Sequence, residues 1–205
     1  MLKIFLTRHG QNEDNAAGIL NGHRDLPLTE FGRQQARQLA EGIKHANLTF
    51  DTIYTSPLCR AFETAVIIAE ILNLPKPEVM NELIERDFGV MTGKPVRDIE
   101  KLCGADIVKT GTITYFLSPE GAETFPILLE RGKCAIAKII ARHADGSVLV
   151  VTHGDFGKML YAAYYNLAWM NTLTMFHFGN SELLLLARDS KPEESHFIHI
   201  EQKNH

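Results

Sequence analysis

Leu6-Thr7-Arg8-His9-Gly10 lies close to the amino terminus and decides how the chain is interpreted. The apolar residues at its start predict a short buried strand over residues 3–6. The strand ends on an arginine, a histidine and a glycine, and ligands of open α/β sheets bind outside the carboxyl ends of strands. Arg8 offers a planar fork of donors that suits phosphate, and His9 is easily neutral and nucleophilic near neutral pH. We therefore expect an α/β fold with an anion-binding site at this strand end.

A second strand ends in the same way. Residues 147–152 form a near-continuous apolar run, and His153-Gly154 follows it directly. A single histidine at such a place is as often held by local backbone as by a ligand. Two junctions of this kind in one chain are much harder to attribute to chance, so we expect His9 and His153 to belong to one site.

Two further segments fit the same site. Arg60 falls in the first turn of a helix predicted to start at Ser56-Pro57, and helix amino termini favour anions. An arginine there adds charge and a bidentate fork of donors. The loop over residues 82–89 carries several acidic side chains, and their spacing alone does not choose among them.

Strand patterns alternate with helical patterns along the chain. This alternation predicts an α/β fold with a mostly parallel central sheet, and we expect a three-layer α/β/α sandwich. The further predicted strands cover residues 51–55, 147–152, 172–178, 182–188 and 196–200, and the predicted helices cover residues 32–44, 56–72, 123–142 and 156–165. Residues 89–122 have no clear period, and we interpret them as a cap or lid insertion within a single domain over residues 1–205. Residues 189–195 and the tail after Glu201 are expected to be exposed.

Composition limits the classes of function. The 205 residues suffice for one well-buried domain, and a net charge of −4 argues against a nucleic-acid-binding protein. No apolar run approaches the roughly 18 residues that span a bilayer, and the amino terminus lacks the pattern of a signal peptide. The 3 cysteines are widely spaced and form neither a disulfide framework nor a zinc pattern. We expect a cytoplasmic protein that binds neither membrane nor nucleic acid, and the sequence is silent on its oligomeric state.

Together these residue types suit phosphoryl transfer. The charged oxygens of a phosphoryl group need fixed donors, which Arg8, Arg60 and His153 could supply. His9 could attack the phosphorus and carry the phosphate covalently, while a carboxylic acid protonates the leaving oxygen. Such chemistry requires no metal and no cofactor, and the sequence contains no metal-ligand set.

Taken in order, the motifs resemble the histidine phosphatase superfamily, on the branch that includes cofactor-dependent phosphoglycerate mutases and fructose-2,6-bisphosphatases. The similarity runs nearly end to end, and a set of motifs in this order is highly specific. It is carried by Arg8-His9-Gly10-Gln11 with Asn15, Asn21-Gly22, Asp25-Leu26-Pro27-Leu28-Thr29 with Gly32, Ser56-Pro57-Leu58 with Arg60-Ala61 and Thr64-Ala65, Glu85 with Gly89, Gly121-Ala122-Glu123-Thr124, His153-Gly154, and Asn180-Ser181.

The resemblance implies a role for each candidate residue. It implies that His9 is the nucleophile and that Glu85 is the proton donor, with Glu82 as the second choice for the acid. The phosphate pocket is then formed by Arg8, Arg60, His153 and Gly154, with Asn15 and the backbone around Gly22 and His23 at its edge. Asp155 stands where the family usually has a small residue, and it adds negative charge beside the pocket.

The function expected from the sequence is hydrolysis of a small-molecule phosphate monoester, without a metal, through a phosphohistidine intermediate. The first alternative is a phosphoglycerate mutase-type phosphotransferase. Mutases of the family tend to be longer, with larger insertions around the site, so this compact chain favours the phosphatase. The second alternative is a non-catalytic phosphate-binding protein, which the complete set of reactive residues disfavours.

Overall fold

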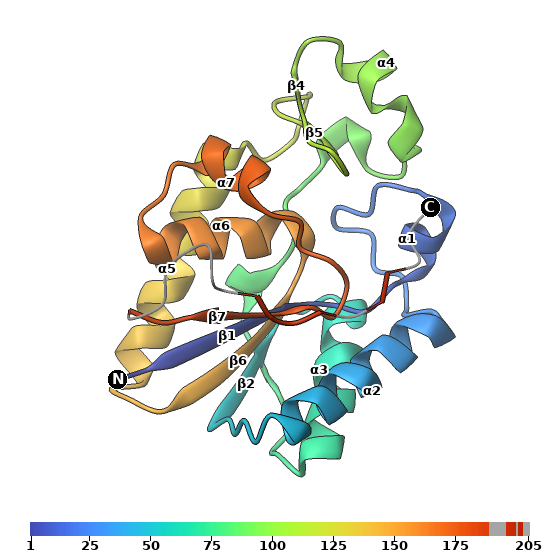
Figure 1. Ribbon diagram of the computed structural model, residues 1–205. Coiled ribbons are helices and arrows are strands. Elements are labelled where there is room, and N and C mark those ends of the chain that lie inside the picture. The colour runs from blue at the N-terminus through green and yellow to red at the C-terminus, as the bar shows by residue number, and fades with distance from the viewer. Residues whose placement is uncertain (189–195, 200, 203–205) are drawn as a thin grey trace.

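The structure is a computed structural model that describes residues 1–188, 196–199 and 201–202. Its central sheet has 6 strands in the order β3-β2-β6-β1-β7-β8 (Figure 1). The strands are β1 (Lys3–Arg8), β2 (Thr52–Thr55), β3 (Glu78–Val79), β6 (Ser147–Thr152), β7 (Leu183–Leu186) and β8 (His196–Ile198). The first four strands of that order run parallel, whereas β7 is antiparallel to β1 and β8 is antiparallel to β7. The prediction of a mostly parallel sheet is confirmed.

Helices cover both faces of this sheet (Figure 1). Helices α2 (Glu30–His45) and α3 (Cys59–Leu72) lie on one face, and α5 (Phe125–Arg142), α6 (Gly154–Tyr165) and α7 (Trp169–Met175) lie on the other. The short helix α1 (Glu13–Ala17) follows the first strand. Side chains of a strand alternate between faces, so Ile4 and Leu6 pack with the α5 side while Phe5 packs with the α2 side. The three-layer prediction is therefore confirmed.

The pairing of β1 with β6 brings the two His-Gly junctions together. Lys3 pairs with Ser147 and Arg8 pairs with Thr152 in a parallel register. The residues that follow, His9 and His153, thus leave the sheet side by side at its carboxyl edge.

The amino termini of α2 and α3 are stabilised differently. Thr29 caps α2, since its hydroxyl accepts a hydrogen bond from the Gly32 N–H at 3.0 Å. Ser56 does not cap α3: that helix starts only at Cys59, whose N–H donates to Asp25 Oδ1 at 2.6 Å. The expected start at Ser56 is wrong by three residues: the Ser56 hydroxyl accepts from the Leu58 N–H at 3.3 Å ahead of the helix and lies 2.7 Å from Nε2 of His153.

Residues 89–122 contain short elements that rise above the sheet (Figure 1). They are three-residue 3₁₀ turns at Gly89–Met91 and Val96–Asp98, helix α4 (Ile99–Cys103), and a hairpin of β4 (Ile107–Lys109) and β5 (Thr114–Phe116). Another such turn, Asn81–Leu83, comes before this segment. A small core of Phe88, Met91, Ile99 and Phe116 holds the segment together.

One predicted strand is wrong. The sequence predicts a strand over residues 172–178, but α7 covers Trp169–Met175. Packing overrides the local preference here. Trp169 stacks on Phe125 of α5 with ring centroids 5.6 Å apart, and the Thr172 hydroxyl donates back to the Ala168 carbonyl at 3.1 Å, as in a helix.

The expectations for the carboxyl-terminal end are tested only in part. Residues 189–195, 200 and 203–205 lie outside the described residues. The edge strand expected over residues 196–200 is found as β8. Gln202 is partly buried, contrary to the expected exposure of the tail, because its side-chain amide and the Asn180 backbone exchange hydrogen bonds of 2.9 and 3.0 Å.

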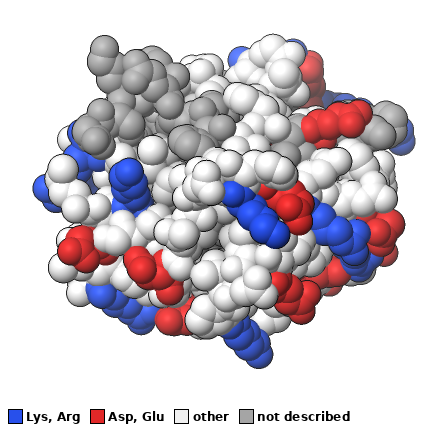
Figure 2. Space-filling model, turned by 60° about the horizontal axis from the view of Figure 1, so that its bottom comes forward, with Lys and Arg blue, Asp and Glu red and all other residues white. Residues whose placement is uncertain are grey.

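The face seen in Figure 2 carries Lys and Arg side chains interspersed with Asp and Glu, without an extended basic stripe. Among the described residues, no helix combines the length and apolar character needed to cross a membrane. That the chain binds no nucleic acid, and that it is cytoplasmic, stay predictions.

Candidate active site

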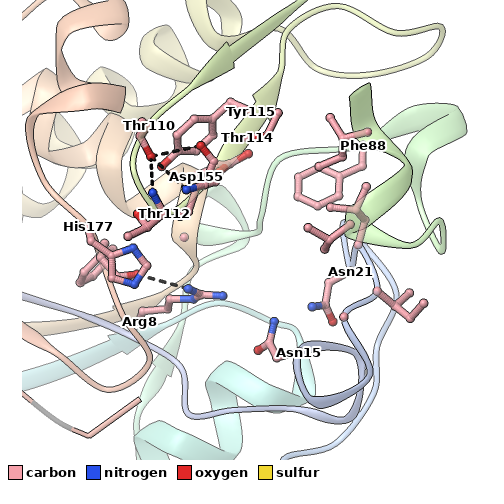
Figure 3. A pocket seen from close by; sticks show the side chains of 18 of the residues that line it. Arg8, Asn15, Asn21, Phe88, Thr110, Thr112, Thr114, Tyr115, Asp155 and His177 are labelled. Carbon is pink, nitrogen blue, oxygen red and sulfur yellow. Dashed lines mark hydrogen bonds between the residues drawn. The ribbon is translucent and has the colours of Figure 1, made fainter. Parts of the chain in front are cut away.

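A cavity of about 750 Å³ opens at the carboxyl ends of β1 and β6 (Figure 3). Its walls come from the ends of these strands, from α3 and α6, and from the segment over residues 89–122. Of the residues expected at the site, six line the cavity: Arg8, His9, Asn15, Arg60, Glu85 and Gly154. The backbone is closely packed behind it, since a Cβ on Gly10 would lie 2.3 Å from the Gly32 carbonyl oxygen.

His9 is buried, and its two ring nitrogens have different partners. Nδ1 lies 2.7 Å from the Gly10 carbonyl oxygen, which can only accept, so Nδ1 carries the proton. Nε2 accepts a hydrogen bond of 3.2 Å from Nε of Arg60, as an unprotonated nitrogen does. Burial, and then the charges of Arg60 and Arg8, lower the pKa of His9 well below its ordinary value. The ring is therefore neutral, with its lone pair on Nε2.

His153 lies directly against His9, with ring centroids 5.1 Å apart. Its Nε2 is 2.7 Å from the Ser56 hydroxyl, while its buried Nδ1 has no hydrogen-bond partner in the described part of the chain. Burial, followed by the charge of Arg60, lowers the pKa of His153 well below the usual value. His153 adjoins His9 and is not itself part of the cavity lining.

Arg8 is half-buried at the centre of the site and lines the cavity. Its Nη1 donates to the Phe178 carbonyl at 3.2 Å, and its buried Nε has no partner among the described residues. Desolvation lowers the pKa of Arg8, and the charges of Glu85 and Asp155 oppose that shift. Buried donors without partners carry a desolvation cost that a bound oxyanion would remove.

Arg60 is held rigidly by three contacts. Besides the bond to His9, its Nη1 donates to the Arg24 carbonyl at 2.5 Å and its Nη2 donates to the Gly22 carbonyl at 2.9 Å. Burial lowers the pKa of Arg60 to about 10, so its guanidinium is charged at neutral pH. Gly22 is not part of the cavity lining, and it contributes to the site by binding Arg60 through its carbonyl.

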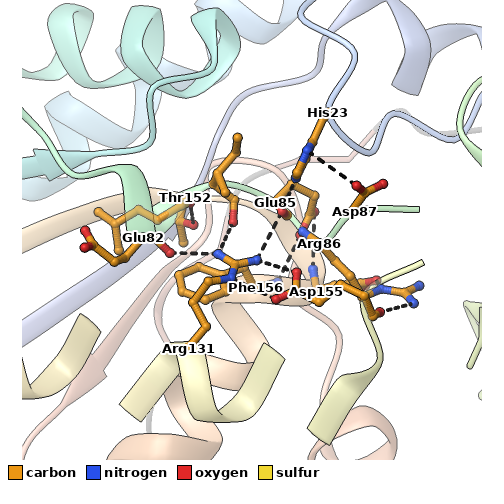
Figure 4. A network of polar contacts seen from close by, with 12 residues as sticks. His23, Glu82, Glu85, Arg86, Asp87, Arg131, Thr152, Asp155 and Phe156 are labelled. Atoms are coloured by element: carbon orange, nitrogen blue, oxygen red, sulfur yellow. Dashed lines mark hydrogen bonds and ion pairs between the residues drawn. The ribbon is translucent and has the colours of Figure 1, made fainter. Parts of the chain in front are cut away.

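Glu85 is the acidic residue of its loop that lines the cavity. Figure 4 shows it within a network of polar contacts. Its carboxylate accepts hydrogen bonds from the N–H groups of Arg86 at 2.8 Å and Phe156 at 3.0 Å. Burial, and then the charge of Asp155, raise the pKa of Glu85 above its ordinary value. The raised pKa favours the protonated form that a general acid needs.

Glu82 and His23 lie outside the cavity lining. Glu82 forms an ion pair with Lys138 on α5, and this contact lowers the pKa of Glu82. The side chain of His23 is 40% exposed, and its Nε2 lies 2.8 Å from the Glu85 carbonyl oxygen. Asn15 does line the cavity, and Figure 3 shows its side-chain nitrogen pointing into it.

Several residues that support the site were not identified from the sequence. Arg131 of α5 donates to the carbonyls of Glu82 and Ile84, both at 2.7 Å, and to that of Glu85 at 3.2 Å, which fixes the acidic loop (Figure 4). The Asn180 side chain donates to the His9 carbonyl at 2.8 Å. Lys158 and Tyr115 line the cavity although they are buried. The sequence offered two signals: Asn180 is among the motifs that carry the family resemblance, and Lys158 is a lysine in an apolar helical stretch.

No group of three or more histidine, cysteine, aspartate or glutamate side chains that could hold a metal ion is found in the described ranges. Independence from metal stays a prediction.

The comparisons with known proteins agree with this geometry. The family model described as "Histidine phosphatase superfamily (branch 1)" matches residues 4–198. A 2,3-bisphosphoglycerate-dependent phosphoglycerate mutase of Parvibaculum lavamentivorans is 36% identical over 156 residues, covering 74% of each chain. Phosphoserine phosphatase 1 of Hydrogenobacter thermophilus is 33% identical over 165 residues, covering 80% of this chain and 76% of the relative.

Among solved structures, the mycobacterial glucosyl-3-phosphoglycerate phosphatase in complex with VO3 is similar, with a TM-score of 0.78 and 27% identity. The match covers 90% of this chain and 92% of that one. These relatives are phosphatases and phosphoglycerate mutases. The chain is an enzyme of the histidine phosphatase superfamily, branch 1.

Proposed function

We propose that the chain hydrolyses a phosphate monoester by transferring the phosphoryl group first to Nε2 of His9 and then to water. The observation that carries this proposal is the fixed tautomer of His9. Its proton is held on Nδ1 by the Gly10 carbonyl, so the lone pair of Nε2 is available at the cavity. A neutral imidazole in this tautomer is ready to attack without a separate base.

The donors around His9 suit a phosphoryl group. Nε of Arg8 and Nδ1 of His153 are buried without partners in the described chain, and Nε of Arg60 currently binds the attacking nitrogen. When a phosphoryl oxygen takes over the Arg60 N–H, the lone pair on Nε2 is released towards phosphorus. Preorganised donors of this kind stabilise the charge that develops in transfer. A similar phosphatase was solved in complex with VO3, an oxyanion, which supports the proposal that this fold binds such groups.

Glu85 is proposed as the proton donor. The bond from Nε2 of His9 to phosphorus forms while the ester bond breaks, and the Glu85 proton goes to the leaving oxygen. The Glu85 carboxylate then takes a proton from the attacking water, the phosphorus–nitrogen bond breaks, and its electron pair returns to Nε2. Glu82 is less suitable because its carboxylate is engaged by Lys138 outside the cavity.

The charges of the outer cavity favour a phosphatase over a mutase. A bisphosphoglycerate-dependent mutase must hold a second anionic group of its substrate, which calls for a second set of cations. Outside Arg8 and Arg60, the described lining offers the cations Arg97 and Lys158. Lys158 is already bound to backbone carbonyls, and Arg97 shares the lining with Glu100. We propose that residues 89–122 cap this cavity within a single domain and cover the leaving group of a small phosphorylated substrate.

A leaving-group series tests the proposal. A sugar alkoxide needs protonation as it departs, whereas nitrophenolate needs it far less. Glu85→Gln should therefore slow hydrolysis of a sugar phosphate by about 100- to 10,000-fold and slow phosphoenzyme formation from nitrophenyl phosphate much less. The matched control is Glu82→Gln in the same loop, for which rates near those of the wild type are expected.

Two results would argue against this assignment. A leaving-group-dependent loss in Glu82→Gln, with none in Glu85→Gln, would transfer the acid role to Glu82. Isomerisation of phosphoglycerate in the presence of bisphosphoglycerate, faster than release of inorganic phosphate, would favour the mutase.

A further inference from the structure

Lys158 is a buried cation that the proposed reaction does not use. It lies in the middle of α6, only 2% of its surface is exposed, and it borders the cavity. Lysine is almost never fully buried unless its charge has partners. Here the ammonium donates to the carbonyls of Leu173 at 2.8 Å and Thr172 at 3.4 Å, and also to the carbonyl of Phe176.

These carbonyls belong to the end of α7 and to the residue after it. The last carbonyls of a helix lack partners within the helix and carry partial negative charge, so a cation there is stabilising. The rings of Phe176 and Tyr115 add to this, with centroids 4.8 and 5.4 Å from Nζ. The ammonium of Lys158 therefore fixes where α7 ends and where the next segment begins.

That next segment, residues 176–181, runs directly to the reactive residues. The Phe178 carbonyl accepts from Arg8 Nη1 at 3.2 Å, the Asn180 side chain donates to the His9 carbonyl, and the Ser181 N–H donates to the Arg8 carbonyl at 2.9 Å. The Phe178 ring is also pressed against α6 beside Lys158, since a Cβ on Gly157 would lie 2.4 Å from it. Residues 176–178 are thus bound to α6, and residues 178–181 form hydrogen bonds with Arg8 and His9.

We propose that Lys158 is a positioning residue: by anchoring residues 176–178 to α6, its ammonium sets the place of the Phe178 carbonyl and so orients the Arg8 guanidinium for the oxyanion. This inference rests on the proposed function, because it takes the cavity to be the phosphoryl site. Lys158 itself is committed to carbonyls and does not contact the substrate.

The charge of Lys158 is sensitive to its surroundings. Burial lowers the pKa of Lys158 to about 8, and Asp155, one turn earlier in α6, opposes that shift. The other titratable side chains at this wall of the cavity are Tyr115 of β5 and His177 (Figure 3). Below pH 8 the anchor is charged and complete, and in mildly basic solution it weakens.

Binding of tungstate, measured by calorimetry, tests the inference without turnover. Tungstate mimics phosphate and stays a dianion through the neutral and basic range. Lys158→Met preserves the length of the side chain and removes the charge, and it should weaken tungstate binding about tenfold by misplacing Arg8. In an Arg8→Lys background, the guanidinium contact with the Phe178 carbonyl is already lost. There, Lys158→Met should lower the tungstate affinity by less than about twofold. Lys158→Arg should restore most of the affinity.

The matched control is Lys138→Met, which removes an exposed lysine of α5 and should leave the affinity unchanged. The role of Lys158 would be overturned if Lys158→Met lowered the tungstate affinity equally in the wild type and in Arg8→Lys. It would also be overturned if Lys158→Met caused no loss of affinity. Failure of the wild type to bind tungstate would instead overturn the proposed phosphoryl site. If Lys158→Met does not fold, a pH series decides. The tungstate affinity of the wild type should fall about tenfold between about pH 7 and 9.5, and that of Arg8→Gln, which has no titrating group at position 8, should not. Parallel profiles would contradict the inference.

Discussion

At the scale of single residues, the site depends on where protons and charges are held. His9 and His153 are buried and neutral; the Gly10 carbonyl fixes the proton of His9 on Nδ1, and Nε2 of His153 exchanges a hydrogen bond with the Ser56 hydroxyl. Arg8 and Arg60 keep their charge in the same small volume. This arrangement suits the nucleophilic role that we propose for His9 and surrounds the ring with donors.

The buried histidines should make stability depend on pH. Their pKa values are lowered in the folded chain, so below about pH 6.5 the unfolded chain binds more protons than the folded one. The free energy of unfolding should therefore fall as pH falls from about 7 to 5.5, by up to about 1.4 kcal/mol per pH unit for each such histidine. Urea denaturation across this range measures it, and His153→Gln should flatten the slope. A slope unchanged by His153→Gln would mean that His153 is not held neutral.

Arg60 should act through geometry as well as charge. Its three nitrogens are all engaged, and lysine retains the charge but lacks the planar fork. We expect Arg60→Lys to lower kcat/KM by about 100- to 1,000-fold, the usual effect of losing one preorganised donor. Steady-state kinetics with a phosphate monoester measures this, and near-wild-type values would remove Arg60 from the phosphate site.

At the scale of elements, the reactive residues that follow the strand ends could be predicted from the sequence. The distant residues that hold them in place could not. Arg-His-Gly and His-Gly follow apolar runs, and the parallel register of β1 and β6 then brings His9 and His153 together. The helix α7 was mistaken for a strand because its residues favour extended structure locally, and the packing of Trp169 on Phe125 is not visible in the sequence. The choice of Glu85 over Glu82 within one loop likewise depends on contacts from distant helices.

One such contact gives a prediction for the acidic loop. Arg131 binds the carbonyls of Glu82, Ile84 and Glu85, and it also forms an ion pair with Glu123 at 2.7 Å. Arg131→Met should free the loop and lower the rate on a sugar phosphate by about tenfold or more, with a smaller loss on nitrophenyl phosphate, because the general acid is misplaced. Arg142→Met, on the same helix, is the control. An equal loss on both substrates would show that Arg131 acts on the whole site rather than on the acid.

At the scale of the whole molecule, an acidic chain places Arg8 and Arg60 together at one end of its sheet. The net charge is −4, yet the centre of the cavity is cationic through Arg8 and Arg60. The segment over residues 89–122, whose sequence has no clear period, contributes much of the outer wall. Its irregular backbone is held by its own small core, which explains why periodicity could not reveal it.

The donor set predicts the response to chelators. Arginine and histidine donors, without a cluster of carboxylates or thiolates in the described residues, should support catalysis without a metal. Activity should survive dialysis against EDTA within about twofold of its starting value. Loss of activity in EDTA that magnesium or zinc restores would contradict the mechanism.

The most direct test of the account is to trap the phosphoenzyme. The enzyme is mixed with a substrate labelled in its phosphate, quenched in base within the first turnovers, and digested to locate the label. The account predicts an adduct that is stable in base and labile in acid, that maps to His9, and that is absent from folded His9→Ala protein. A His9→Ala enzyme that still turns over, or a label on any other residue, would contradict it.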